Sequence, residues 1–335
     1  MNEDIISQLR EDTLRLVAEM RHDDEQNKST FRKYLVNGYD MLMREAEHLD
    51  CLLDPILPRV GVASLVGTSD SGKSTLLRGL AMAVASGAKR YLDFELRPRY
   101  NRALYVATED DMNAVSALMQ KQIVELGTPR EAYSSLDFIF DTEELADVLD
   151  KALEERPADL VIIDAFADLY TGPMNENNRV RSYLNIYSQL AQRHSTLFIF
   201  LHHTGKRTEV LTPSKHNAIG SQGFEAKMRL MMELRHDPVR PDVRHLCIVK
   251  GNYLSKEFKH ESFVLYFTSG LNFVSTGERV PFAALRERDT ERDDRIAQAR
   301  AMRDEGMTLQ EIADVLGYKD RSTVSKILKR LDVEC

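Results

Sequence analysis

The feature that most constrains the fold is the stretch from Gly67 to Ser74, which reads GTSDSGKS and meets every fixed position of the pattern G-x-x-x-x-G-K-[ST]. The short apolar run 62–66 comes before it and predicts a buried strand. The apolar stretch 75–85 comes after it and predicts a helix. The sequence therefore predicts a strand, a glycine-rich loop and a helix in immediate succession.

The residue types of this loop suit a bound triphosphate. Gly67 and Gly72 permit backbone conformations in which successive N–H groups point at phosphate oxygens, at the positive end of the helix dipole. Lys73 supplies a point charge to the outer phosphates, and the Ser74 hydroxyl is placed to ligate Mg²⁺. The alternative is a glycine-lysine turn that happens to precede a helix. We expect ATP and Mg²⁺ to bind, with these residues around the phosphates: Gly67, Thr68, Ser69, Asp70, Ser71, Gly72, Lys73, Ser74 and Thr75.

The composition is ordinary for a folded protein. Of the 335 residues, 43% are hydrophobic and 29% charged, and no apolar run approaches the roughly 18 residues of a membrane helix. The acidic start, from Met1 to Asp4, is unlike a secretory signal, and the cysteines Cys51, Cys247 and Cys335 predict neither a disulfide framework nor a zinc site. We expect a large and a small domain in a reducing cytoplasm, with no membrane. A net charge of -8 leaves room for DNA binding only through a local patch or an assembled channel.

From Leu52 onwards, short apolar runs alternate with helical stretches. Strands that alternate with helices imply an α/β fold, with a mostly parallel sheet that helices cover on both faces. Ligands of such sheets bind at the carboxyl ends of the strands. The predicted strands are residues 62–66, 103–107, 136–140, 160–163 and 197–201.

Polar residues follow three of these strands. Glu109 is the candidate general base that polarises the attacking water, and Asp164 follows four apolar residues and suits the magnesium shell together with Ser74. His202 and His203 end another strand, where a sensor of the γ-phosphate would lie. The alternatives are a helix cap for each acid and a hydrogen-bonded structural role for each histidine.

These motifs, together with Gly220-Ser221-Gln222, resemble those of the RecA-type ATPases, and most closely the RepA-like hexameric helicases of plasmids and other mobile elements. The resemblance covers about Leu52 to Phe273. It implies a RecA-like ATPase domain in which Lys73, Glu109 and Asp164 serve ATP hydrolysis. It also implies that His203 couples the nucleotide to a nucleic-acid loop.

In this sequence that loop is the segment 206–223. We expect it to track a DNA strand in a central channel without reading its bases, through Lys206, Arg207, Lys215, Gly220 and Ser221. The alternative is a mobile surface loop. Base stacking has little support, because Phe224 supplies the one nearby aromatic ring.

Further along, the run 245–253 predicts a strand that ends in a turn. Related ring ATPases present a basic finger to the neighbouring subunit at this place, and Lys250 is the candidate, with Arg244 in reserve. The alternative for Lys250 is a solvated lysine at a strand end.

Helical segments flank the ATPase domain, which we expect at residues 49–285. Residues 1–48 predict a helix, a break and a second helix, which pack either on their own domain or on a neighbouring subunit. Residues 286–335 predict a small all-helical unit that resembles a helix-turn-helix, with a capping box at Thr308 and Glu311 and a helix end at Gly317. The expected DNA-facing residues of its last helix are Arg321, Ser322, Thr323, Ser325, Lys326, Lys329 and Arg330. The alternative is a protein-interaction module.

Two functions from different classes remain. The first is a DNA helicase or translocase of a mobile element, which assembles as a hexamer and holds single-stranded DNA in its channel and duplex DNA on its terminal module. The second is a DNA-binding regulator that ATP switches without unwinding. A metabolite kinase is less well supported, because neither a base for a substrate hydroxyl nor an arginine-rich lid is apparent.

Overall fold

The computed structural model describes residues 35–43, 49–205, 208, 210–219, 222–286, 290–318 and 320–331, without the side chains of 290–294, 326, 327 and 329–331. The chain divides into two compact units between Leu49 and Asp50. In the first, the short helix α2 (Gly38–Leu42) begins at Asn37, whose side chain accepts a hydrogen bond from the backbone N–H of Asp40 at 2.9 Å. Most of the predicted N-terminal helices lie outside the described residues.

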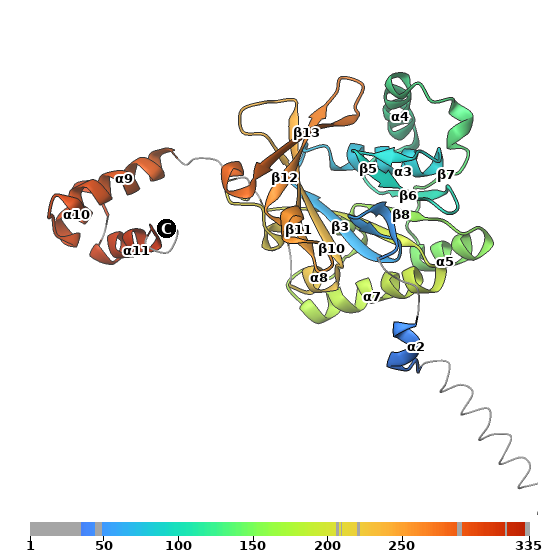
Figure 1. Ribbon diagram of the computed structural model, residues 1–335, viewed down its shortest axis with the longest axis horizontal. Coiled ribbons are helices and arrows are strands. Elements are labelled where there is room, and N and C mark those ends of the chain that lie inside the picture. The colour runs from blue at the N-terminus through green and yellow to red at the C-terminus, as the bar shows by residue number, and fades with distance from the viewer. Residues whose placement is uncertain are drawn as a thin grey trace, which may run out of the picture. The chain divides into compact units, whose positions relative to one another are not determined.

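A mixed sheet organises the second unit (Figure 1). Within the described residues it has nine strands in the order β13-β12-β11-β10-β3-β9-β8-β6-β7. The run from β10 to β7 is parallel, and β10 to β13 form an antiparallel meander. The strands are β3 (Gly61–Gly67), β6 (Ala103–Ala107), β7 (Leu136–Ile139), β8 (Leu160–Asp164), β9 (Leu197–His203), β10 (Leu230–His236), β11 (Val243–Gly251), β12 (Glu261–Phe267) and β13 (Phe273–Pro281).

Helices cover both faces of this sheet, so the predicted mostly parallel α/β architecture is confirmed. Alternate residues of β3 enter opposite cores: Ala63 and Leu65 pack on the face of α3, whereas Val62 and Val66 pack on the face of α5 and α7. Strands buried on both faces are apolar throughout, which explains why these runs were readable in the sequence. The helices are α3 (Lys73–Ala85), α4 (Met112–Leu126), α5 (Leu145–Glu155), α6 (Phe166–Leu169), α7 (Asn177–His194) and α8 (Gln222–Lys227).

A second, antiparallel sheet is absent from the sequence-based prediction. Its order is β2-β1-β5-β4, and it joins the segment before the glycine-rich loop to the segment after α3. Strands this short carry too few residues for an alternating pattern to emerge. They are β1 (Cys51–Asp54), β2 (Leu57–Pro58), β4 (Arg90–Tyr91) and β5 (Phe94–Leu96).

The C-terminal helices have a core of their own, made by Ala299, Ile312, Ala313 and Val324. The helices are α9 (Thr290–Asp304), α10 (Leu309–Leu316) and α11 (Arg321–Leu331). The predicted capping box is confirmed, because the Thr308 side chain accepts from the N–H of Glu311 and the Glu311 carboxylate accepts from the N–H of Thr308. The predicted helix end at Gly317 is confirmed too, with φ +73.

Across the residues that the structure describes, no helix is both long enough and apolar enough to span a membrane.

Candidate functional site

The glycine-rich loop connects β3 to α3, and its two pattern glycines are sterically required. A Cβ on Gly67 would lie 2.4 Å from the backbone oxygen of Leu234 on the neighbouring strand β10. Gly72 has φ +92, and a Cβ there would lie 2.8 Å from Cζ of Phe273 at the start of β13. Larger residues at either position would force the loop away from the sheet.

The loop folds around its own carbonyl of Thr68. The Lys73 ammonium donates to this oxygen at 2.6 Å, and the Ser71 hydroxyl donates to it at 2.9 Å. Burial lowers the pKa of Lys73, and the nearby carboxylates of Asp164, Glu109 and Asp70 partly offset that effect. Ser69 and Asp70 form the exposed tip of the loop, while Ser74 and Thr75 are half-buried in the first turn of α3.

Asp164 ends β8 beside this turn. The Tyr105 hydroxyl donates to its Oδ2 at 2.5 Å, and the Ser74 side chain also hydrogen-bonds to the carboxylate. Burial raises the pKa of Asp164, which these two hydrogen bonds oppose. Its Oδ1 is buried and has no hydrogen-bond partner among the described residues. A carboxylate oxygen without a partner, beside a serine hydroxyl, is a donor set that fits Mg²⁺.

Glu109 and His203 come together at the ends of two other strands. Nε2 of His203 lies 3.5 Å from Oε1 of Glu109, whose side chain is 50% exposed. The register aligns Gly67 of β3 with His203 of β9, and Ala107 of β6 with Asp164 of β8. The sheet therefore brings the predicted strand-end residues to the edge that carries the glycine-rich loop, as Figure 1 allows the reader to follow.

Thr108 holds two of these strand ends together, a role that the sequence analysis missed. Its hydroxyl donates to the carbonyl of Asp164 at 2.9 Å and accepts from the N–H of Ala165 at 2.8 Å. Its own N–H donates to the same carbonyl at 2.8 Å. A small hydroxyl residue directly before the candidate base was the available signal in the sequence. Thr108 thereby positions Glu109 relative to Asp164.

The neighbouring histidines have different surroundings. His202 is 1% exposed, and its Nε2 lies 2.7 Å from the carbonyl oxygen of Ile219. Its ring packs against Phe166 and Phe224, and burial lowers its pKa to about 4. His202 is therefore a structural residue of the aromatic core. Phe224 is fully buried in the same core and is not available for base stacking.

The expected DNA loop is partly tied to the body of the domain. Lys206, Arg207, Gly220 and Ser221 lie outside the described residues. Lys215, in the 3₁₀ turn η2 (Lys215–Asn217), donates to Oε1 of Glu225 at 2.7 Å. This part of the loop is therefore connected to α8 by a side-chain hydrogen bond.

A buried ion pair on β10 holds the base of the loop. Glu233 and Arg235 lie 3.3 Å apart and are almost fully buried. Glu233 accepts from the Ser214 N–H and the Asn217 amide, each at 3.1 Å, and Arg235 donates to the carbonyls of Leu211 and Thr208.

The two finger candidates differ in where they point. Lys250 lies near the end of β11, and its ammonium donates to the Glu225 carbonyl at 2.6 Å, so it is held rather than solvated. Burial lowers its pKa. Arg244 is 7% exposed and its Nε donates to the Ser71 carbonyl of its own glycine-rich loop at 3.1 Å. The reserve assignment of Arg244 as a finger is therefore wrong, because its guanidinium is buried within its own subunit.

The C-terminal module presents a pocket of ≈ 500 Å³ that residues of all three helices line. It contains three of the expected DNA-facing residues and adds Arg303 and Gln310, which the sequence analysis missed. Thr323 is half-buried, and the side chains of Lys326, Lys329 and Arg330 lie outside the described part. The lining residues are Arg303, Thr308, Leu309, Gln310, Arg321, Ser322 and Ser325.

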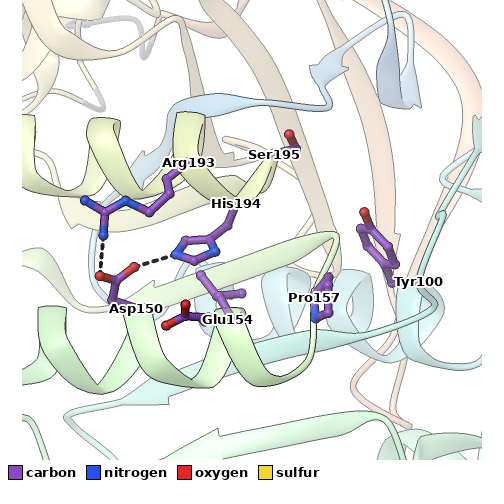
Figure 2. Close-up of a pocket in the computed structure, with 8 residues that line it drawn as sticks. Tyr100, Asp150, Glu154, Pro157, Arg193, His194 and Ser195 are labelled. Carbon is purple, nitrogen blue, oxygen red and sulfur yellow. Dashed lines mark hydrogen bonds and ion pairs between the residues drawn. The ribbon is translucent and has the colours of Figure 1, made fainter. Parts of the chain in front are cut away.

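A separate pocket of ≈ 470 Å³ lies at the end of the sheet where β8 and β9 begin. In Figure 2 the carboxylate of Asp150 on α5 faces both Arg193 and His194 at the end of α7. The His194 Nε2 lies 2.5 Å from Oδ1 of Asp150. The hydrogen bond from His194 is the main cause that lowers the pKa of Asp150. The strand-end residues above meet at the opposite edge, so this pocket is not part of the candidate site.

Comparisons with known proteins agree with this architecture. An AAA domain family model matches residues 26–209, which is more than half of the chain. A solved ATPase domain of another protein aligns with a TM-score of 0.53 at 10% identity, covering 70% of this chain and 95% of that one. The RadB recombinase aligns with a TM-score of 0.46 at 15% identity, covering 64% and 90%. No curated protein sequence matches the chain. The chain therefore belongs to the AAA domain family, with the fold of a RecA-type P-loop ATPase.

Proposed function

We propose that this protein is an ATP-driven motor that moves along DNA, a ring-forming helicase or translocase of the RepA type. The observation that carries the proposal is the pair of Glu109 and His203, which lie 3.5 Å apart although they follow or end strands β6 and β9, between which β8 lies. His203 also ends β9 shortly before the segment 206–223, which is expected to contact DNA. A change at the nucleotide thus has a direct route to the DNA loop.

In this proposal the chain binds ATP through residues Gly67 to Thr75. Lys73 exchanges its contact with the Thr68 carbonyl for the outer phosphates, and Ser74 and Asp164 hold Mg²⁺. When bound, Mg²⁺ neutralises charge on the phosphates. Glu109 accepts the proton of the attacking water and is exposed enough to reach it. His203, in contact with Glu109, reports the state of the γ-phosphate.

The DNA contacts of the proposal fall in two places. Lys206, Arg207, Lys215, Gly220 and Ser221 contact one strand in the central channel of a hexamer, and Lys250 reaches the nucleotide of the neighbouring subunit. The C-terminal module binds duplex DNA through α11. There Arg321, Ser322, Thr323 and Ser325 approach the bases and backbone, and Lys326, Lys329 and Arg330 add phosphate contacts.

Native mass spectrometry combined with ATPase assays tests the proposal. We expect a hexamer in the presence of ATP, and turnover that rises when a single-stranded oligonucleotide is added. A Lys73→Ala variant serves as the control for contaminating ATPases. A chain that stays monomeric with ATP and DNA, and whose turnover ignores single strands, would refute the motor.

One observation favours a second candidate, an ATP-switched regulator that binds duplex DNA without unwinding it. The pocket of the C-terminal module combines Arg303 and Arg321 with hydroxyl and amide side chains. None of its described lining residues carries a carboxylate, although Glu311 and Asp314 hydrogen-bond to the lining residues Thr308 and Gln310. A basic and hydroxyl-rich surface suits phosphate contacts on a duplex. The regulator predicts duplex binding that depends on ATP, with no strand separation in a fluorescent unwinding assay.

A further inference from the structure

Glu225 contacts Lys215 and His216 of the proposed DNA loop. Its Oε1 accepts from the Lys215 ammonium at 2.7 Å, and its Oε2 lies 3.2 Å from Nδ1 of His216. The Glu225 side chain is only 15% exposed, whereas those of Lys215 and His216 are 41% and 66% exposed. One largely buried carboxylate therefore faces two side chains that reach solvent.

The carboxylate lies on a fixed support. Glu225 belongs to α8, which runs beside α7 (Figure 1). The Gly223 N–H donates to the side chain of Asn177 at 3.0 Å, and the Lys227 ammonium donates to that of Asn185 at 2.6 Å. α8 is therefore attached at both ends to the long helix that covers the sheet.

The backbone around Lys215 and His216 is also fixed. Ser214 precedes Lys215 and Asn217 follows His216, and both are bound to Glu233 of β10. The Lys215 and His216 side chains are thus free to change partner by rotation, without movement of the loop. Lys250 does not compete for the carboxylate, because its ammonium binds the backbone carbonyl of Glu225.

We propose that the Glu225 carboxylate is an internal competitor of DNA phosphate for Lys215 and His216, so that binding of a single strand exchanges one anion for another. The inference rests on the proposed function, in which this loop contacts DNA. Glu225 is then a positioning residue that sets the affinity for DNA. Without DNA it keeps the Lys215 ammonium and the His216 ring in place, and with DNA it releases both side chains to the phosphates.

The test is the affinity of the full chain for a fluorescent thirty-nucleotide oligo-dT, measured by anisotropy across a salt series with ATP present. Glu225→Gln keeps the shape of the side chain and removes the competing charge. Because the lysine of this ion pair is open to solvent, the pair is only weakly stabilising, and we expect binding to tighten about two- to five-fold at low salt. The gain should shrink as salt screens the pair. Glu257→Gln changes the net charge equally at an exposed position that has no hydrogen bond or ion pair to the described residues of the loop, and should leave binding as in the wild type.

Variants at Lys215 separate exchange from general repulsion. Lys215→Gln should lower the magnitude of the log-log salt slope by about 0.7, the value for one contact with single-stranded phosphate. In the Lys215→Gln background, Glu225→Gln should give less than half of the gain in affinity for oligo-dT that it gives in the wild-type background. The full gain in affinity in that background would overturn the proposed exchange. The proposal would also be overturned if the Glu225→Gln variant melted at the wild-type temperature and bound oligo-dT with the wild-type affinity. If neither the wild-type protein nor any variant binds oligo-dT, the proposed function as a DNA motor is refuted as well.

Discussion

Arg244→Met is a sharp test of how the far edge of the sheet supports the glycine-rich loop. The Arg244 side chain donates to the Ser71 carbonyl at 3.1 Å and to the carbonyls of Pro241 and Val243 at 2.6 and 2.9 Å, and it stacks over Phe267 at 5.6 Å. Methionine retains most of the apolar contact but leaves these oxygens without the guanidinium. An unsatisfied buried acceptor costs about 1 to 3 kcal/mol.

We therefore expect Arg244→Met to lower the free energy of unfolding by about 2 to 4 kcal/mol, and Tm by roughly 5 to 15 °C, for a domain of this size. If about 1.4 kcal/mol of that loss falls on the geometry of the loop around Ser71, KM for ATP rises about tenfold while kcat changes little. Thermal unfolding and steady-state ATPase kinetics give the two numbers.

Arg279→Met is the matched control. Arg279 lies over the Phe263 ring at 4.0 Å and donates to the carbonyls of Ser262, Glu257 and Glu261, but has no contact with the glycine-rich loop among the described residues. It should lose stability with KM unchanged. Equal changes in KM for the two variants would refute the view that Arg244 positions the loop.

The remaining predictions concern catalysis, assembly, DNA binding and pH. Lys73→Ala should abolish hydrolysis, whereas Glu109→Gln should still bind a fluorescent ATP analogue but lose about 10² to 10⁴ in kcat; retained turnover in Glu109→Gln excludes it as the base. When Lys250→Ala subunits are mixed with wild-type subunits, ATPase activity should fall by more than the fraction of variant subunits. A loss equal to that fraction argues against action of Lys250 on the neighbouring subunit's site. Removal of residues 286–335 should leave most ATPase activity. If the module neutralises about four phosphates, the full chain should bind duplex DNA with a log-log salt slope about 3.6 steeper than that of the truncated chain. Equal slopes would make the module a protein-interaction unit. The folded-state pKa of His202 is about 4, below its ordinary 6.5, so the stability that His202 contributes is present above pH 6.5 and is lost as pH falls towards 4. His202→Phe should therefore flatten the dependence of Tm on pH between these values. An unchanged dependence would assign the pH effect to other groups.

The parts of the fold that the sequence predicted are those with a local signature. The strands around the glycine-rich loop are apolar because both of their faces are buried, and Asp164 is conspicuous as the first charge after four apolar residues. The helix boundaries at Thr308 and Gly317 follow from hydrogen bonds within a few residues. In each case the information lies within one segment.

What the sequence did not reveal depends on contacts between distant segments. Arg244 is separated by 173 residues from the Ser71 carbonyl that it supports, and nothing in its own surroundings distinguishes it from a solvated arginine. The two histidines of β9 are adjacent in sequence, and the alternation of the strand alone sends one to Glu109 and the other into the aromatic core. Glu225 gave no signal either, because its partners are defined by the path of the loop.

The buried pair of Glu233 and Arg235 has a mechanical consequence. The two residues are two positions apart on β10 and grip the loop at Thr208, Leu211, Ser214 and Asn217. A force applied to this part of the loop is therefore transmitted through short polar contacts to β10, because these contacts hold the loop at several points. β10 is the direct neighbour of β3, with Glu233 aligned to Val66, one residue before Gly67. Load on the loop thus reaches the phosphate-binding end of the sheet across a single pair of strands.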